Sequence, residues 1–188
     1  VHVVYYNANE NISAAQINSQ IDVLNADFAG TGLNVNTCPS AFQSLISNTN
    51  ISFCKATKDP NGNTLTEPGI DDGVVIGHTY YGSTGLVSAP YDKGRTTTHE
   101  VGHWLGLYHI SGDSECGDDE CNDTPPQRGN EGDGQGLNYG CPTFPHQPNS
   151  CTGTGANGEL FMNFMDYTND ACMYLFTPDQ RERMQTVM

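Results

Sequence analysis

The chain has 188 residues, which is enough for one domain with a sizeable apolar core. Its 22 acidic and 7 basic side chains give a net charge of −15, which argues against a nucleic-acid partner because phosphates need Lys and Arg. No run approaches the roughly 20 apolar residues that a membrane-spanning helix needs, so no membrane partner is expected.

Seven cysteines are many for a cytosolic chain of this size. Together with the acidic, Gly- and Asn-rich composition, they indicate a secreted protein with disulfide bonds. Because the count is odd, at least one thiol stays unpaired within the chain. Cys38 and Cys54 flank one segment and could form a bridge, although the residues alone leave the pairing open.

The first part of the chain predicts short strands around one amphipathic helix. Residues 1–6 are rich in Val and Tyr and predict a strand. Ser13 and Gln16 form a capping box at the start of a helix predicted over 13–28. Further short strands are predicted at 33–36, 51–54 and 74–76.

A candidate edge strand follows. Its residues are Gly85, Leu86, Val87, Ser88 and Ala89. They precede Pro90, and proline is tolerated at the edge of a sheet but not in a central strand. An extended peptide could add to this edge as a further strand, so residues 85–89 are candidate substrate-binding residues. The alternative is an ordinary strand or loop.

The segment from His99 to His109 reads H-E-V-G-H-W-L-G-L-Y-H and matches a signature of zinc proteases. In a helix predicted over 96–107, His99 and His103 lie on one face and can share a Zn²⁺ ion. Gly106 can adopt a left-handed conformation and end the helix, so that the chain turns and brings in His109 as the third ligand.

Three protein ligands leave a fourth position for water, which is typical of a catalytic zinc site. Glu100 is one step round the helix and is the candidate general base for a zinc-bound water. In the alternative interpretation, Glu100 closes a capping box with Thr97, and each histidine is an ordinary one. Five specified residues in register should arise by chance in about one chain in 10⁵ of this length, which favours the zinc site.

The amino-acid composition of the chain changes after the signature. Residues 111–158 are rich in Gly, Asp, Asn, Pro and Cys, and they predict an irregular segment held by cross-links or ions. The run Thr177-Pro178-Asp179-Gln180 predicts the start of a last helix over 178–188, with Thr177 as the N-cap and Gln180 completing a capping box.

Three further motifs follow the zinc signature: Asp123-Thr124-Pro125, Met165-Asp166-Tyr167, and a run that begins with Cys172-Met173 and ends with Arg183-Met184. Together with the signature they resemble the pappalysin family of metzincin proteases, and within it the secreted bacterial and fungal members. The resemblance covers nearly the whole chain.

This resemblance implies an α+β metzincin fold in a single catalytic domain over residues 1–188. The upper subdomain, 1–106, would contain a mixed, mostly parallel twisted sheet with a backing helix and the active-site helix. The lower subdomain, 107–188, would be irregular and end in a helix. The cleft would lie between them, with zinc at its floor.

The resemblance also implies roles for two residues after the signature. Met165 would lie beneath the metal as an apolar base without being a ligand, and Tyr167 would donate a hydrogen bond to the tetrahedral intermediate. The alternatives are core filling for Met165 and a buried packing role for Tyr167.

A structural calcium site is implied in the acidic loop after the third histidine. Asp119 and Thr124 would bind through their side chains and Asn122 through its carbonyl, because Ca²⁺ takes several oxygen ligands. The alternative is a solvated acidic loop.

The order of the cysteines in the resemblance favours two crossed bridges, Cys116–Cys151 and Cys141–Cys172. Cys121 departs from the family pattern, in which a non-cysteine stands at this place.

The predicted function is that of a secreted zinc-dependent metalloendopeptidase acting on protein or peptide substrates. Some relatives cleave before Arg or Lys with an acid just beyond the Met165 segment, which makes Asp170 the candidate for a basic preference after the scissile bond. The alternative is a metal-binding or adhesion module without catalysis on a protease scaffold. The presence of Glu100 and Tyr167 counts against it.

Overall fold

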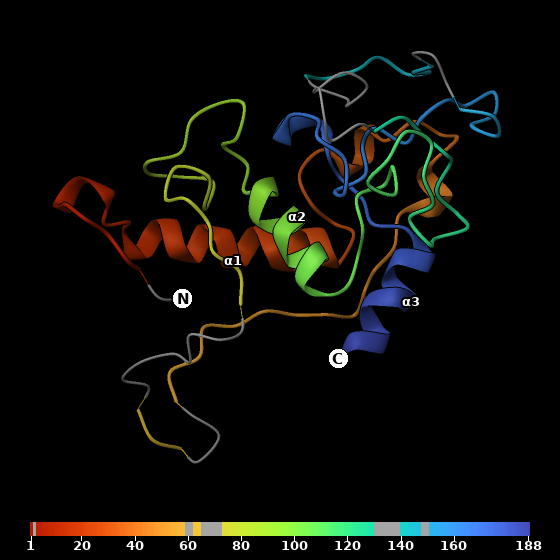
Figure 1. Ribbon diagram of the computed structural model, residues 1–188. Helices are drawn as coiled ribbons and strands as arrows, with labels where there is room; N and C mark the ends of the chain where they lie inside the picture. Colours follow the sequence, from red (N-terminus) through yellow and green to blue (C-terminus); the bar gives the residue numbers. More distant parts are fainter. Residues whose placement is uncertain (2, 59–61, 65–72, 130–139, 148–150) are drawn as a thin grey trace.

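The computed structural model describes residues 1, 3–58, 62–64, 73–129, 140–147 and 151–188. The described residues form three α-helices: α1 (Ala14–Phe28), α2 (Arg95–Trp104) and α3 (Pro178–Val187). They also form four single-turn 3-10 helices: Ala8–Glu10, Val35–Thr37, Gln43–Leu45 and Asp170–Cys172. Figure 1 shows α2 lying across α1, which it contacts, and α3 standing near the C-terminus of the chain.

The predicted helix starts at both ends of the chain are confirmed. The Ser13 hydroxyl accepts the Gln16 N–H at 3.1 Å and caps α1. At α3, Thr177 and Gln180 form the full capping box. No helix in the described ranges is long and apolar enough to cross a bilayer.

The active-site helix differs from the prediction at both ends. α2 begins at Arg95 after Gly94, so Thr97 lies inside the helix and does not form an N-terminal capping box with Glu100. The helix ends at Trp104, before the predicted position 107. Gly106 has a φ of 87°, a conformation that suits glycine, and the chain reverses there.

The predicted sheet is not confirmed. The described residues contain no assigned strand, only the isolated bridges Lys58–Thr64, His146–Gly158 and Asn163–Leu175. Side chains form hydrogen bonds with main-chain groups that would otherwise pair in a β-ladder. The Asn25 side-chain amide accepts the Phe53 N–H at 2.8 Å and donates to the Phe53 carbonyl at 2.9 Å. The segment 51–54 is therefore bound to α1 through a side chain, and among the described residues it pairs with no strand.

Buried amides on α1 hold the segment before α2 in the same way. Gln16 bonds three main-chain groups in residues 78–86. Gln20 accepts the Gly82 N–H at 2.6 Å and donates to the Gly94 carbonyl at 3.1 Å. These bonds fix the chain that leads into α2.

A buried ion pair joins α1 to the first turn of α2. Arg95 Nε lies 2.7 Å from Asp27 Oδ2, and both side chains are almost fully buried. The Thr98 hydroxyl donates to the same carboxylate oxygen at 2.8 Å. Because Thr98 directly precedes His99, this pair sets the position of the helix turn that carries the signature.

The apolar core lies between the helices and the C-terminal third of the chain. Phe28 of α1 packs against Phe176, whose ring centroid lies 4.9 Å away, and Phe176 packs against Phe164 at 4.8 Å. Met165 is completely buried in the same cluster. The segment 160–176 therefore packs as a buried strip against the helix that bears the histidines.

Candidate metal centre and active site

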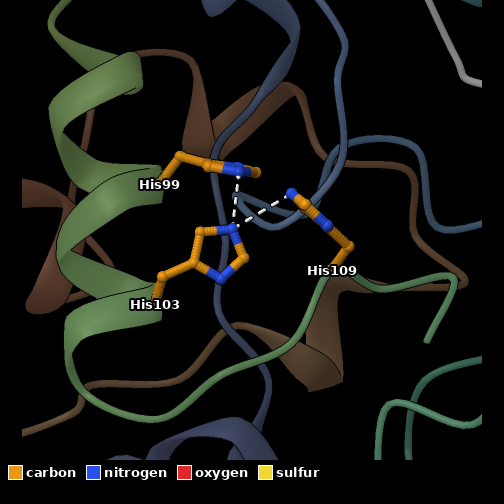
Figure 2. A group of neighbouring side chains, drawn as sticks. All are labelled: His99, His103 and His109. Carbon is orange, nitrogen blue, oxygen red and sulfur yellow. Dashed lines mark hydrogen bonds between the residues drawn. The ribbon is translucent and has the colours of Figure 1, made fainter. Parts of the chain in front are cut away.

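Three histidine side chains converge on one point. His99 and His103 project from one face of α2, and the turn at Gly106 returns the chain so that His109 faces them (Figure 2). His103 Nε2 lies 3.0 Å from His99 Nε2 and 3.0 Å from His109 Nε2. Among the described residues these three make up the group of ligand atoms that could hold a metal ion.

The opposite ring nitrogens are each occupied by an acceptor. His99 Nδ1 lies 2.7 Å from the Phe164 carbonyl oxygen and His103 Nδ1 lies 2.8 Å from that of Leu107. His109 Nδ1 bonds the Asp113 carboxylate. With the proton on Nδ1, each Nε2 offers a lone pair to a metal.

The electrostatics favour neutral imidazole at the innermost ligand. Burial, followed by the neighbouring His103 and His109, lowers the pKa of His99 to about 3. A neutral ring is the form that binds a metal ion.

Two further predicted residues border the same space. The Tyr167 hydroxyl lies 2.8 Å from His109 Nε2. Glu100 is half-buried and lines, with the three histidines and Tyr167, a cavity of about 410 Å³.

Met165 packs against α2: a Cβ on Gly102 would lie 2.5 Å from its sulfur. Its carbonyl accepts the Ile110 N–H at 3.0 Å, next to His109.

Sequence comparison decides the family. The profile of a peptidase family described as Pregnancy-associated plasma protein-A matches residues 61–188, which include the whole site. The chain belongs to this family, the pappalysins. Its fold is that of metzincins, and it is a metalloendopeptidase that acts on peptides or proteins.

Relatives and solved structures agree with this assignment. Extracellular metalloprotease 1 of Coccidioides posadasii is 32% identical over 99% of this chain and 74% of its own length. An extracellular metalloprotease of Arthroderma benhamiae is 31% identical over 98% and 69%. Mature mirolysin of Tannerella forsythia, solved with a cleaved peptide, has a TM-score of 0.85 at 39% identity, covering 98% of this chain and 87% of mirolysin. This pappalysin is accordingly an extracellular protein.

Asp170 is among the residues that line this cavity in the pappalysin, but it is only 2% exposed. Its Oδ2 accepts the main-chain N–H groups of Lys93 at 2.8 Å and Arg95 at 3.2 Å. Burial raises the pKa of this carboxyl above its ordinary value. The predicted specificity residue thus also anchors the start of α2.

Residues 85–89 are not an edge strand. Gly85 has a φ of 83°, and the Leu86 N–H donates to Gln16 Oε1 at 3.0 Å, so this group is not free to pair with a peptide. Four of the five residues are exposed, and Val87 is half-buried. Tyr91 and Thr96 are among the residues that line the cavity, whereas residues 85–89 are not.

The acidic loop brings together two of the three predicted calcium ligands. The Thr124 hydroxyl donates to Asp119 Oδ1 at 2.8 Å, while Asp119 Oδ2 is buried without a hydrogen-bond partner. Burial raises the pKa of Asp119 to about 6. Asn122, the third predicted ligand, is exposed. Its main-chain N–H donates to Asp179 Oδ2 at 2.9 Å.

The cysteines pair in part as expected. The structure contains the disulfides Cys116–Cys151 and Cys141–Cys172, the same pairs that the resemblance implies. The bridge between Cys38 and Cys54 is not formed: Cys38 is buried against the core, Cys54 is exposed, and both are free thiols, as is buried Cys121.

Sequence reasoning missed two charged contacts at the site, that of Arg95 with Asp27 and that of Asp113 with His109. Arg95 pairs with Asp27 across two helices, which no local spacing reveals. Asp113 contacts a signature histidine, and its signal was local: an acid four residues after His109.

Proposed function

We propose that the chain is a zinc-dependent endopeptidase in which Glu100 is the general base and Tyr167 stabilises the oxyanion. The observation that carries this proposal is the convergence of three imidazole Nε2 atoms with Glu100 and Tyr167 on one cavity of about 410 Å³. Residues 1–106 would form the upper and 107–188 the lower part of one catalytic domain, since α2 supplies two histidines and the later chain supplies His109 and Tyr167.

The donor set fits zinc. Three imidazole nitrogens, each with the second nitrogen of its ring hydrogen-bonded, are a typical catalytic zinc set. A zinc ion held there would act as a Lewis acid and bring the pKa of water toward neutral pH.

Each side chain around the cavity then has a separate role in the reaction. Glu100 would take a proton from the attacking water and pass it to the leaving amine. The Tyr167 hydroxyl would donate a hydrogen bond to the carbonyl oxygen of the substrate as negative charge develops on it. Met165, fully buried against Gly102, would support the histidines from the core without touching the reacting atoms.

The test is hydrolysis of a denatured protein by the wild type and by Glu100→Gln. We expect the substitution to lower kcat/KM about 10²- to 10⁴-fold, as removal of a general base does, and a zinc chelator to abolish the activity. Zinc content should remain that of the wild type, because Glu100 is not a ligand. Glu182→Gln, an exposed acid on α3, is the matched control and should keep full activity.

Full activity of Glu100→Gln, or of the chelated wild type, would contradict the proposal. Loss of bound zinc in Glu100→Gln would contradict the separation of base and ligands.

We also propose a preference for a basic residue after the scissile bond, determined by Asp170. Its support is the presence of this buried carboxylate among the residues that line the histidine cavity. Cleavage of a peptide library should show Lys or Arg at that position. Asp170→Asn keeps an acceptor oxygen for the N–H groups of Lys93 and Arg95, and it should weaken the preference. A dominant apolar residue in the wild-type profile would refute it.

We propose that residues 85–89 contact an extended substrate. Two features support this: these residues are mostly exposed, and only Pro90 separates them from Tyr91, which lines the cavity. Ser88→Pro should then raise KM without changing kcat. An unchanged KM would count against substrate contact at this segment.

We propose a structural Ca²⁺ ion at Asp119, Asn122 and Thr124. The buried, unpartnered Oδ2 of Asp119 supports a cation at this loop. Added Ca²⁺ should raise the melting temperature of the wild type, and Asp119→Asn should remove that increase. Equal increases in both proteins would place the ion elsewhere.

A further inference from the structure

The outward ring nitrogens of the three histidines have different kinds of partner. His99 and His103 each bond a main-chain carbonyl oxygen, at 2.7 and 2.8 Å. His109 instead bonds the carboxylate of Asp113 through Nδ1. One of the three candidate ligands therefore has a charged partner, and the other two have neutral ones.

The local chain fold delivers Asp113 to this position. The Gly112 N–H donates to the His109 carbonyl at 2.8 Å and closes a tight turn. Gly112 and Asp113 both have positive φ angles, of 63° and 55°, a region that Gly and Asp tolerate. A Cβ on Gly112 would collide with the main chain of Asp118, so the loop folds closely on itself and returns the Asp113 side chain to the ring.

The other side of His109 is anchored as well. The Ile110 N–H donates to the Met165 carbonyl at 3.0 Å, and Ile110 is buried. The main chain at His109 is thus held by the core, and Asp113 contacts the ring itself through Nδ1.

We propose that Asp113 is a positioning residue for the third metal ligand. Its carboxylate accepts the Nδ1–H of His109, directs Nε2 of that ring toward the metal and makes the ring a stronger ligand. A hydrogen bond to an ionised acceptor is roughly twice as strong as one to a neutral carbonyl, which distinguishes this ligand from the other two. The inference rests on the proposed zinc site and adds the residue that strengthens it.

Two substitutions separate this role from a role in the turn alone. Asp113→Gly removes the acceptor but tolerates the positive φ. Asp113→Asn also tolerates that φ and keeps an acceptor oxygen, but it removes the charge. The matched control is Glu115→Gln, which makes the same charge change in the same loop. The Glu115 side chain is 60% exposed and pairs with Arg128 at 3.0 Å, not with a histidine.

The measurement is the zinc dissociation constant of each purified protein at neutral pH, obtained by competition with a chelator. We expect Asp113→Gly to weaken zinc binding about 10- to 100-fold, as loss of outer partners does at zinc sites. Asp113→Asn should weaken it less, because the amide oxygen still accepts the Nδ1–H. Glu115→Gln should stay within about twofold of the wild type. The visible absorption of the cobalt-substituted proteins should change in both Asp113 variants and not in the control.

Several outcomes overturn the proposal. If zinc binds the wild type tightly and Asp113→Gly equally well, Asp113 has no such role, although the zinc site itself stands. If Glu115→Gln weakens binding as much as Asp113→Gly, loop charge and not the contact with His109 is responsible. If Asp113→Gly does not fold, the Asn variant decides, and an unchanged dissociation constant refutes the proposal. Failure of the wild type to bind zinc contradicts the proposed function instead.

Discussion

Gln16 is a buried polar residue whose replacement tests how α1 holds the chain before the active-site helix. It is 1% exposed. Its Nε2 donates to the carbonyl oxygens of His78 at 2.9 Å and Tyr81 at 2.8 Å. Its Oε1 accepts the Leu86 N–H at 3.0 Å. The change Gln16→Leu removes all three bonds and keeps a side chain of similar size in the helix.

The expected loss follows from these three bonds. Each buried hydrogen bond contributes about 0.5–1.5 kcal/mol net, so we expect the free energy of unfolding to fall by about 3 kcal/mol. Leu fills most of the space of Gln, so a cavity adds little. For a domain of this size a loss of that magnitude corresponds to roughly 6–12 °C in Tm.

Chemical and thermal unfolding of Gln16→Leu measure this loss directly. Asn18→Leu is the matched control, because Asn18 is exposed on the same helix and the change is equally apolar. We expect the control to stay within about 0.5 kcal/mol of the wild type. A loss below about 1 kcal/mol in Gln16→Leu, or an equal loss in the control, would refute the account of α1 as the support of residues 78–86.

Three further changes test the site and its frame. Tyr167→Phe should lower kcat about 10²-fold with zinc content unchanged, and a wild-type kcat in steady-state assays would remove Tyr167 from the reaction. Gly102→Ala should cost about 1–3 kcal/mol through contact with Met165, more than the ~1 kcal/mol gained in helix propensity, so thermal unfolding that shows a net gain would contradict this packing. Replacing both Cys116 and Cys151 by Ser opens a loop with a sequence separation of 35 and should cost about 4 kcal/mol in denaturant unfolding. An unchanged midpoint would show that this bridge does not stabilise the fold.

Local sequence rules predicted the parts of the site whose geometry is local. The spacing of His99 and His103 puts both rings on one face of a helix regardless of the rest of the fold. Gly106 ends the helix within the signature, so a turn of a few residues brings His109 back to the side on which the other two histidines lie. Helix starts at Ser13 and Thr177 are equally local, because an N-cap side chain satisfies N–H groups only three residues away.

The tertiary structure decided everything that depends on partners distant in sequence. The short strands predicted from composition are replaced, in the described residues, by segments bonded to the amides of Gln16 and Asn25. A main-chain N–H or C=O group can bond any suitable partner that the packing brings near. Packing likewise keeps the free thiol of Cys38 in the core, away from Cys54, and buries Asp170 beneath the start of α2.

For the metal centre, local spacing is enough to predict which ring nitrogens could bind an ion, because those atoms come from one helix and one turn. How the rings are held depends on the tertiary fold: the Phe164 carbonyl and the Tyr167 hydroxyl reach the histidines from more than fifty residues away. Helical spacing is set by local main-chain hydrogen bonds, whereas these contacts exist only after the buried strip at 160–176 has packed against α2.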